Sequence, residues 1–264
     1  MPSRVPRAAP RRPPPRGRPL KLDPLRGSLS PAGAGAALAV GAAVLWGTGW
    51  WGLGALFTFF LGSTAVSRAC PDPAAERGEA KGGRRDAGQV FANGGAPALG
   101  ALLGLADPRV GLWVLTIGLA AAAADTWATA LGATSPAPPR HLLTGRAVEA
   151  GTSGGVTWRG TLGGAAGAAS VGAVGWLGSG EVRLFAACLG VGTLGMLVDS
   201  FLGATLQGRF HCPACDTATE RPRHRCGTIA RPAGGIRWLT NDGVNAISTL
   251  LATGMGWWIV TSMS

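Results

Sequence analysis

The sequence has no tyrosine, only three histidines and few charged side chains, which make up 14% of its 264 residues. Charge is scarcest after residue 31, where long runs combine glycine with alanine, leucine and valine. In a soluble chain, 44 glycines and 19 prolines would suggest disorder. The long uncharged runs exclude that interpretation beyond residue 31. They predict membrane helices whose small faces allow neighbouring helices to approach closely.

Seven apolar runs are candidate membrane spans, since a helix needs about 20 mainly apolar residues to cross the hydrocarbon core. They cover residues 32–48, 52–67, 89–106, 110–131, 156–178, 183–206 and 243–261. No histidine lies in any of them. We therefore predict an all-α integral membrane protein, a polytopic bundle of about seven transmembrane helices over residues 32–264. The other spans are expected to be organised around the run 110–131.

The first 31 residues differ from all that follow, because they hold eight Lys or Arg residues, many prolines and few apolar side chains. This composition predicts a disordered basic tail over residues 1–31. The tail lacks the short basic start and brief apolar stretch of a secretory signal, so we expect it to stay attached. Either it contacts anionic lipid headgroups or it is simply solvated.

Basic residues are distributed unevenly between the two sides of the predicted spans. The long loops and the tail hold 22 of the 24 Lys and Arg residues, and the other side holds only Arg109 and Arg183. By the positive-inside rule, the amino terminus and the long loops are cytoplasmic and the carboxyl terminus lies outside. We expect a multi-pass protein of the cell membrane with no nucleic-acid partner.

The third run has an unusual composition for a membrane helix. Gln89 and Asn93 precede Gly94, Gly95 and Pro97. Backbone groups freed at that depth must be satisfied by protein or by cavity water, so we predict a broken or re-entrant helix. Gln89 and Asn93 are four residues apart and would share a face that points into the bundle. The alternative is a proline kink whose amides are already satisfied.

Three spans bring an acid close to the cytoplasmic side. Asp125, followed by Thr126 and Thr129, ends the fourth run; Asp199 lies in the sixth; and Asp242 precedes Asn245 at the start of the seventh. Mg²⁺ prefers carboxylate oxygens together with substrate phosphates, which predicts a metal–nucleotide site. The rival interpretation is a proton or ion path through the same acids.

Two loops could receive phosphate groups. The loop 151–157 opens with Gly151, Thr152, Ser153, Gly154 and Gly155, and unobstructed amides at such a helix start attract phosphates. It is not a Walker motif, since no Gly-Lys-Ser/Thr follows, and a plain flexible loop is the alternative.

The second loop runs into the third span through Arg84, Arg85 and Asp86. The arginines could clamp a polyphosphate while the carboxylate helps to hold its metal. Otherwise they only determine topology.

The cytoplasmic loop 207–240 contains Cys212-x-x-Cys215 and His224-x-Cys226. Four such ligands within a short polar loop suit a tetrahedral, structural Zn²⁺ site. A cytoplasmic position favours metal over a disulfide. His211 could replace His224, and reduced free cysteines remain the alternative.

Together these motifs resemble an integral membrane family, domain of unknown function 92, that includes plant phytyl-phosphate kinase and animal transmembrane-protein-19-like members. The similarity runs from about residue 33 to the end. It rests, in the family's order, on the motifs that begin at Arg85, Ala92, Ala124, Gly151, Asp199 and Asn241, with the Cys/His loop between the last two. In the family the Ala124 motif usually continues with glutamate, where this chain has Ala130.

The resemblance implies a lipid-phosphate kinase that moves a phosphoryl group from a nucleoside triphosphate to an isoprenyl, phytyl-like monophosphate. Asp125, Asp199 and Asp242 would hold Mg²⁺, and Asn93 and Asn245 would orient oxygens. The 84–89 and 151–155 segments, with Thr126 and Thr129, would bind the nucleotide.

We expect the acceptor's prenyl chain to lie between helices with small faces, along Gly160, Gly163, Gly164 and Gly167. The alternative function is a transporter or flippase-like carrier of a phosphorylated lipid or ion that uses the same acids. A structural membrane protein without chemistry is a third possibility.

Overall fold

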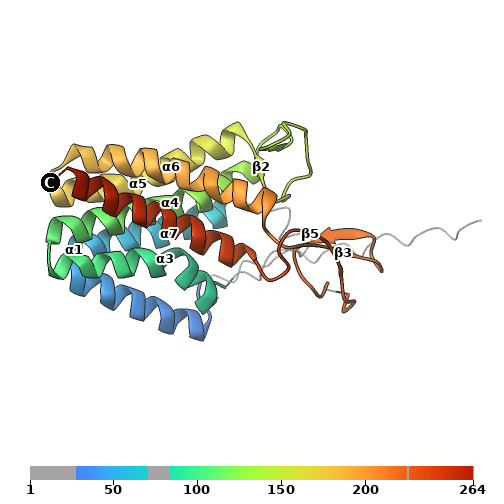
Figure 1. The fold of residues 1–264 in the computed structure, drawn as a ribbon, viewed down its shortest axis with the longest axis horizontal. Coiled ribbons are helices and arrows are strands. Elements are labelled where there is room, and N and C mark those ends of the chain that lie inside the picture. Colours follow the sequence, from blue (N-terminus) through green and yellow to red (C-terminus); the bar gives the residue numbers. More distant parts are fainter. Residues whose placement is uncertain (1–27, 71–83, 225, 264) are drawn as a thin grey trace, which may run out of the picture.

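The computed structural model describes residues 28–70, 84–224 and 226–263. Most of the predicted basic tail lies outside these residues. Figure 1 shows a bundle of roughly parallel helices with short strands gathered at one end. The helices are α1 (Pro31–Ala69), α3 (Ala87–Ala101), the 3-10 helix η1 (Leu102–Leu105), α4 (Pro108–Ala133), α5 (Trp158–Ser179), α6 (Val182–Thr205) and α7 (Asn241–Ser262).

Four helices in the described part are long and apolar enough to cross a membrane, namely α1, α4, α6 and α7. This agrees with the predicted all-α membrane class. Helix α3 has only 15 residues, and α5 is rich in glycine. The number of spans therefore stays a prediction.

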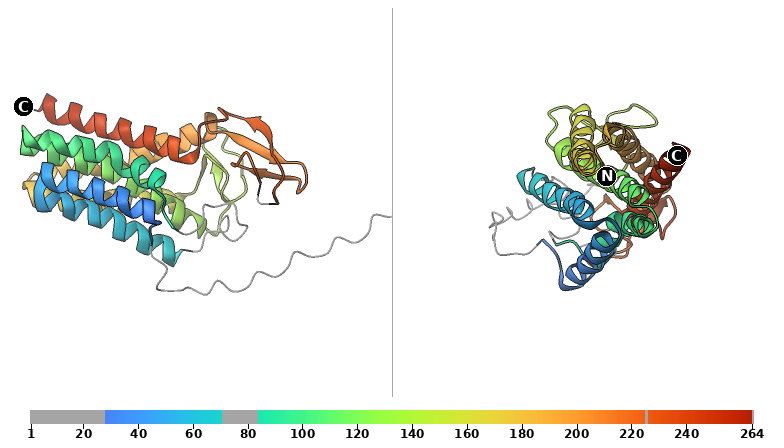
Figure 2. Two further views of the ribbon diagram at one scale, coloured as in Figure 1. Left: turned by 90° about the horizontal axis from the view of Figure 1, so that it is seen from below. Right: turned by 90° about the vertical axis from the view of Figure 1, so that its left-hand side faces the viewer.

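Helix α1 contains the first two predicted runs. Gly49 inside it has φ 64° and ψ −154°, which is not helical and divides α1 into two helices. A positive φ suits glycine, which has no Cβ to clash with the backbone. Figure 2 shows the two halves as separate blue and cyan helices. The Gly-Trp-Trp stretch between the predicted runs thus begins with a residue fit to reverse the chain.

Helix α3 corrects the prediction of a broken third span. Its backbone is α-helical from Ala87 to Ala101, with Pro97 inside, and tightens only at η1. Its small residues allow close packing instead. If Gly94 had a side chain, its Cβ would lie only 3.3 Å from Cγ1 of Val40, so the glycine lets α1 approach. Likewise a Cβ on Gly118 of α4 would lie 2.8 Å from Cγ of Pro97. The glycines and the proline let α3 fit between α1 and α4.

Helix α4 is the central helix, as the sequence predicts. Every residue from Gly111 to Ala124 is buried, and α4 packs against α1, α3, α5, α6 and α7. Its large side chains, such as Trp113 and Ile117, are fully buried. Because α4 is buried on all sides, its sequence has no polar face of the kind that a helix at the surface of a soluble protein shows.

The glycine-lined face of α5 is filled by α4, which corrects the expectation that a prenyl chain lies there. A Cβ on Gly163 would lie 2.5 Å from Cδ1 of Leu131, and one on Gly167 would lie 2.8 Å from the carbonyl oxygen of Ala123. Gly160 and Gly164 are buried in the same way. The small residues bring two backbones together and leave no channel between them.

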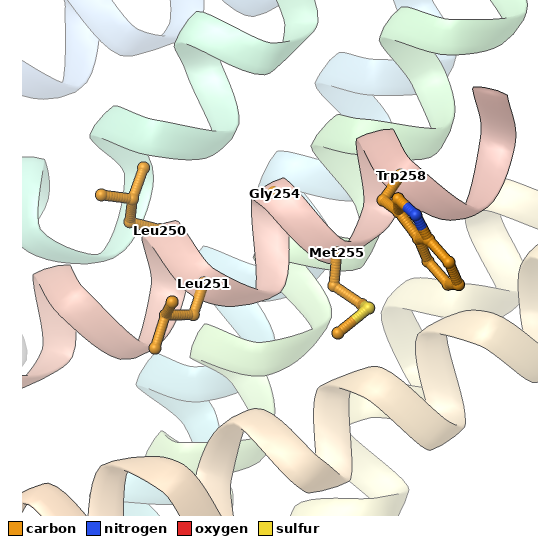
Figure 3. Close-up of a pocket in the computed structure, with 5 residues that line it drawn as sticks. All are labelled: Leu250, Leu251, Gly254, Met255 and Trp258. Atoms are coloured by element: carbon orange, nitrogen blue, oxygen red, sulfur yellow. The ribbon is translucent and has the colours of Figure 1, made fainter. Parts of the chain in front are cut away.

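The outer face of α7 presents an open apolar hollow of about 510 Å³. Figure 3 shows its lining residues, all from this one helix: Leu250, Leu251, Gly254, Met255 and Trp258. The four side chains are exposed in the isolated chain. In a membrane such a face contacts lipid tails.

The strands form two small sheets. Strand β1 (Arg140–His141) pairs antiparallel with β2 (Gly155–Val156). A three-stranded antiparallel sheet has the order β4-β3-β5, formed by β4 (Thr217–Thr219), β3 (Arg209–Cys212) and β5 (Arg231–Gly234). Both sheets lie at one end of the bundle, which we call the sheet end; there α4 and α6 finish and α5 and α7 begin (Figure 1).

Residues 207–240, which we call the Cys/His lobe, are fixed to the bundle by backbone hydrogen bonds. The Ile236 N–H donates to the Leu206 carbonyl at the end of α6 over 2.8 Å, and the Gln207 N–H donates to the Leu202 carbonyl of α6 over 3.1 Å. Within the lobe, the Gly208 N–H donates to the Leu239 carbonyl, next to the start of α7, over 2.9 Å. The lobe therefore ties the end of α6 to the start of α7.

Candidate functional site

Asp125 of α4 and Asp199 of α6 lie side by side within the bundle. Their carboxyl groups are close enough to interact directly with each other, and Asp199 is 9% exposed. Helix α4 ends at Ala133 and α6 at Thr205. At 1.5 Å rise per residue, the two acids lie roughly 10 Å inside the sheet end. The structure thus brings together two of the three acids predicted to share a site.

Helix α7 completes this cluster through two polar side chains. The Ser248 hydroxyl donates to Oδ2 of Asp199 over 2.9 Å. When the Asn245 amide is oriented to satisfy its neighbours, its nitrogen donates to the same Oδ2 over 3.0 Å and to the Asn241 carbonyl over 3.2 Å. Three helices therefore meet at Asp199. Asn245 was predicted as a site residue and Ser248 was not, although both lie on one polar stripe of α7.

Asp242 lies in a second acidic group, beside Asp86. A Cβ on Gly88 would lie 3.2 Å from Oδ1 of Asp86 and 3.4 Å from Oδ2 of Asp242. These residues belong to the first turns of α3 and α7, and Gly88 is exposed. The predicted set of three acids is therefore divided into an inner pair, Asp125 and Asp199, and an outer pair, Asp86 and Asp242. Asn245 links them, since it contacts both Asp199 and the backbone beside Asp242.

Asp86 and Gln89 form a capping box at the start of α3. The Gln89 N–H donates to Oδ1 of Asp86 over 2.9 Å, and the Asp86 N–H donates to Oε1 of Gln89 over 3.3 Å. This reciprocal pair satisfies backbone donors that the helix start leaves without partners. One turn later the Asn93 amide donates to the Gln89 carbonyl over 3.0 Å. All three side chains thus order the first turns of α3 beside the outer pair.

The two predicted arginines have different surroundings. Arg84 is exposed at the sheet end. The Arg85 guanidinium lies over the Phe60 ring, 5.2 Å from its centroid, and burial lowers the pKa of Arg85. The Arg85 N–H also donates to the Ser28 carbonyl over 2.9 Å. Arg85 therefore anchors the start of α3 to α1, and Arg84 is the arginine open to a ligand.

The glycine-rich loop folds as a tight turn against α6. Gly151 has φ 88° and Gly154 has φ 78°, values that favour glycine. A Cβ on Gly154 would lie 2.9 Å from Cα of Ala204 and 3.1 Å from the carbonyl oxygen of Ser200, next to Asp199. The predicted loop is thus close to the inner pair.

The loop 151–157 leads directly into α5, as the sequence predicts. Its residues Gly155 and Val156 form strand β2, and its last residue, Thr157, caps the helix by accepting from the Gly160 N–H over 2.9 Å. Thr152 donates to the Glu149 carbonyl, and the Ser153 hydroxyl donates to Glu220 of the Cys/His lobe. The amides of Thr152 and Gly155 donate to the Glu149 and Thr152 carbonyls, so this part of the loop is a compact turn just before the helix start.

The polar residues after Asp125 lie along the last turns of α4. The Thr126 hydroxyl donates to the Ala122 carbonyl over 2.9 Å, Thr129 is exposed, and Ala130 is 8% exposed. A glutamate in place of Ala130, as the resembled family usually has, would thus be largely buried.

The Cys/His lobe brings four candidate metal ligands together. The ligand atoms of Cys212, Cys215, His224 and Cys226 all lie within 4.8 Å of one another. His211 instead contacts Asp216, with 3.2 Å between Nε2 and Oδ1, so His224 is the histidine of the cluster. All five cysteines of the chain are free thiols. A set of three sulfurs and one imidazole fits a tetrahedral zinc ion.

Hydrogen bonds within the cluster separate the acidities of its thiols. Those with Thr228 and His224 lower the pKa of Cys226 to about 5. Contact with Cys226 raises the pKa of Cys215 to about 11. The low value favours a thiolate at Cys226, the form that binds metal.

Comparison with known proteins gives one family and several relatives. The family model for integral membrane protein DUF92 matches residues 23–253. Protein PGR of Arabidopsis thaliana is 33% identical over 145 residues, which are 49% of this chain and 48% of that protein. An uncharacterized membrane protein of Methanocaldococcus jannaschii is 36% identical over 118 residues, 45% of this chain and 50% of that protein. The chain thus matches about half the length of these relatives. No solved structure matches it.

Proposed function

Because this chain belongs to the DUF92 family of integral membrane proteins, we propose that it is a multi-pass enzyme of the cell membrane. It transfers a phosphoryl group from a nucleoside triphosphate to an isoprenyl monophosphate. The observation that carries the proposal is the inner pair: Asp125 and Asp199 meet inside the bundle, with Ser248 bonded to one of them. Carboxylates at such depth are costly and usually functional.

The donor set of the inner pair fits Mg²⁺, which takes oxygen ligands and is commonly held by one or two carboxylates with substrate phosphates. Asp125 and Asp199 would hold the ion, which when bound neutralises the charge of the phosphoryl group. Oδ2 of Asp199 already accepts from Ser248 and Asn245. Oδ1 of Asp199 and the Asp125 carboxyl group are the oxygens left to face a cation.

The nucleotide would lie between the inner pair and the sheet end. Arg84 is an exposed cation at the start of α3, and the 151–155 loop packs beside Ser200 at the end of α6. The outer pair, Asp86 and Asp242, lies at the starts of α3 and α7 and would hold the metal of the triphosphate. The two pairs would thus sit on either side of the transferred group.

The acceptor already carries a phosphate, so it needs no strong base, and the predicted spans contain no histidine. Since the small face of α5 is filled, we place the prenyl chain on the lipid-facing surface of the bundle with its phosphate toward the sheet end. We also propose that the sheet end and the amino terminus are cytoplasmic, and that zinc stabilises the Cys/His lobe.

The test is an assay of the purified chain in detergent with Mg²⁺, labelled nucleoside triphosphate and a panel of prenyl monophosphates. We expect Mg²⁺-dependent transfer to at least one prenyl phosphate and none with EDTA. A carrier would instead turn over no nucleotide, and its transport would depend on pH through protonation of the acids. Failure to phosphorylate any member of the panel would reject the kinase.

A further inference from the structure

We infer that Ser248 is a positioning residue that fixes which oxygen of Asp199 faces Asp125. The inference rests on the proposed phosphoryl transfer and deepens it. Ser248 is 5% exposed and belongs to α7, whereas the two acids belong to α4 and α6. A hydroxyl buried at a junction of three helices can act only through the groups that it touches.

The contact of Ser248 with Asp199 is specific in geometry. Its hydroxyl lies 2.9 Å from Oδ2 of Asp199 and 3.1 Å from the carbonyl oxygen of Asn245 in its own helix. One hydroxyl proton serves one acceptor at a time, and a charged acceptor forms the stronger bond. Ser248 therefore donates to the carboxylate whenever Asp199 is ionised.

Ser248 and Asn245 together occupy a single oxygen of Asp199. The Asn245 amide nitrogen lies 3.0 Å from the same Oδ2. Two donors on one oxygen resist rotation of the carboxylate about its terminal bond. Oδ1 is then the oxygen of Asp199 that these two donors leave open, and it is the oxygen that the proposed cation needs. Groups that hold metal ligands in place typically change affinity or activity by roughly 10- to 100-fold when removed.

The same contact joins the inner and outer pairs through one rigid element. Asn245 reaches both Asp199 and the Asn241 carbonyl, and Asp242 is the next residue of α7. The hydrogen bonds of Ser248 and Asn245 to Asp199 therefore fix the position of α7 along the axis of α6. We expect their loss to affect metal use and the chemical step more than binding of the prenyl chain.

A neighbouring buried hydroxyl provides the matched control. Thr253 is 7% exposed on the same helix, and its hydroxyl donates to the Thr249 carbonyl over 2.7 Å, within α7. Thr253→Val removes a buried hydroxyl without touching an acid. Ser248→Ala removes the bond to Asp199, Ser248→Thr keeps the hydroxyl, and Ser248→Cys substitutes a weak donor.

The experiment measures kcat, KM for the prenyl phosphate and the Mg²⁺ concentration that gives half-maximal rate. Ser248→Ala should lower kcat by roughly 10- to 100-fold with KM nearly unchanged, and should raise the Mg²⁺ requirement several-fold. Ser248→Thr should recover most of the rate, Ser248→Cys should be intermediate, and Thr253→Val should stay within about twofold of the parent.

A second readout needs no activity, namely the shift in the thermal unfolding midpoint that Mg²⁺ alone causes. Ser248→Ala should reduce this shift, and Ser248→Cys serves if the alanine variant does not fold. An active parent whose Ser248→Ala variant keeps the same kcat, Mg²⁺ requirement and thermal shift overturns the inference. A parent that is inactive with every prenyl phosphate overturns the proposed function instead, and the thermal shift then decides the role of Ser248 alone.

Discussion

At the scale of single residues, carboxyl groups are used in opposite ways at the two ends of the bundle. Asp125 and Asp199 face each other, so two like charges would repel unless a cation or a proton lies between them. Glu181 is instead fully paired, because it accepts from Nε and Nη2 of Arg109 over 2.8 and 3.1 Å and from Nε1 of Trp113 over 3.3 Å. The first arrangement suits a ligand site, and the second holds α6 against α4.

Glu181 gives a prediction about stability and pH. Its hydrogen bond with Arg109 holds the pKa of Glu181 below its ordinary value. The stabilisation of the fold by this ion pair is therefore fully present above the ordinary glutamate pKa. It is lost as the pH falls through the lowered pKa of Glu181 in the folded protein. We expect Glu181→Gln to lower the free energy of unfolding by about 1 kcal/mol at neutral pH, since the pair is partly exposed. Thermal unfolding of the variant and the parent in detergent, at neutral and at acidic pH, measures this difference in stability.

An unfolding midpoint of Glu181→Gln that equals that of the parent at both pH values would refute the role of the pair. Glu149→Gln, which changes an exposed acid at the sheet end, is the control.

At the scale of elements, glycine decides how closely segments approach. Gly154 has a positive φ and also touches α6, whereas Gly145 has φ 65° with open space around it. A substitution at Gly145 therefore tests backbone strain alone, whereas a substitution at Gly154 tests strain together with packing against α6.

We expect Gly145→Ala to cost about 1 kcal/mol from strain alone. Gly154→Ala adds a clash with Ala204 and should displace the loop from α6. If the loop binds the nucleotide, Gly154→Ala raises KM for the triphosphate several-fold, and Gly145→Ala does not. Kinetics of the two variants side by side check this, and equal KM values would remove the loop from the nucleotide site.

The Cys/His lobe gives a second prediction at this scale. Metal analysis should find about one zinc per chain, lost when Cys212 and Cys215 are both replaced by serine. The double variant should lose folded yield more than specific activity, because the lobe ties α6 to α7 and lies outside the acidic pairs. Cys188→Ala, a buried cysteine of α6, should keep its zinc. A well-folded parent without zinc would leave only free thiols.

At the scale of the whole molecule, the apolar runs and the central helix could be predicted from sequence, because hydrophobicity needs no tertiary information. The continuity of α3 could not be predicted, since Gly94, Gly95 and Pro97 signal a break. Only the contacts of Gly94 with α1 and of Pro97 with α4 show a packing role. The Asp125–Asp199 pair follows from two helices that end at the same side. The placement of Asp242 beside Asp86 depends on α3 lying next to α7, which no local pattern reveals.

The charge distribution gives a prediction for the whole fold. Arg146 is exposed at the sheet end and Arg183 at the opposite end. Single cysteines placed there should differ in intact cells: Arg183→Cys should react with an impermeant thiol reagent, and Arg146→Cys should react only after lysis. The same labelling of the parent protein is the control, because it gives the background from the native cysteines. The reverse pattern would contradict both the proposed orientation and a cytoplasmic zinc lobe.

The measurement that tests the inner pair most directly is phosphoryl transfer by Asp125→Asn, Asp199→Asn and the double variant, each compared with an active parent. Because both acids would hold one metal charge, each single change should remove most of the rate, and the double variant should lose little more. Full activity in either single variant, or losses that multiply as for independent sites, would contradict the claim that Asp125 and Asp199 act together on one cation.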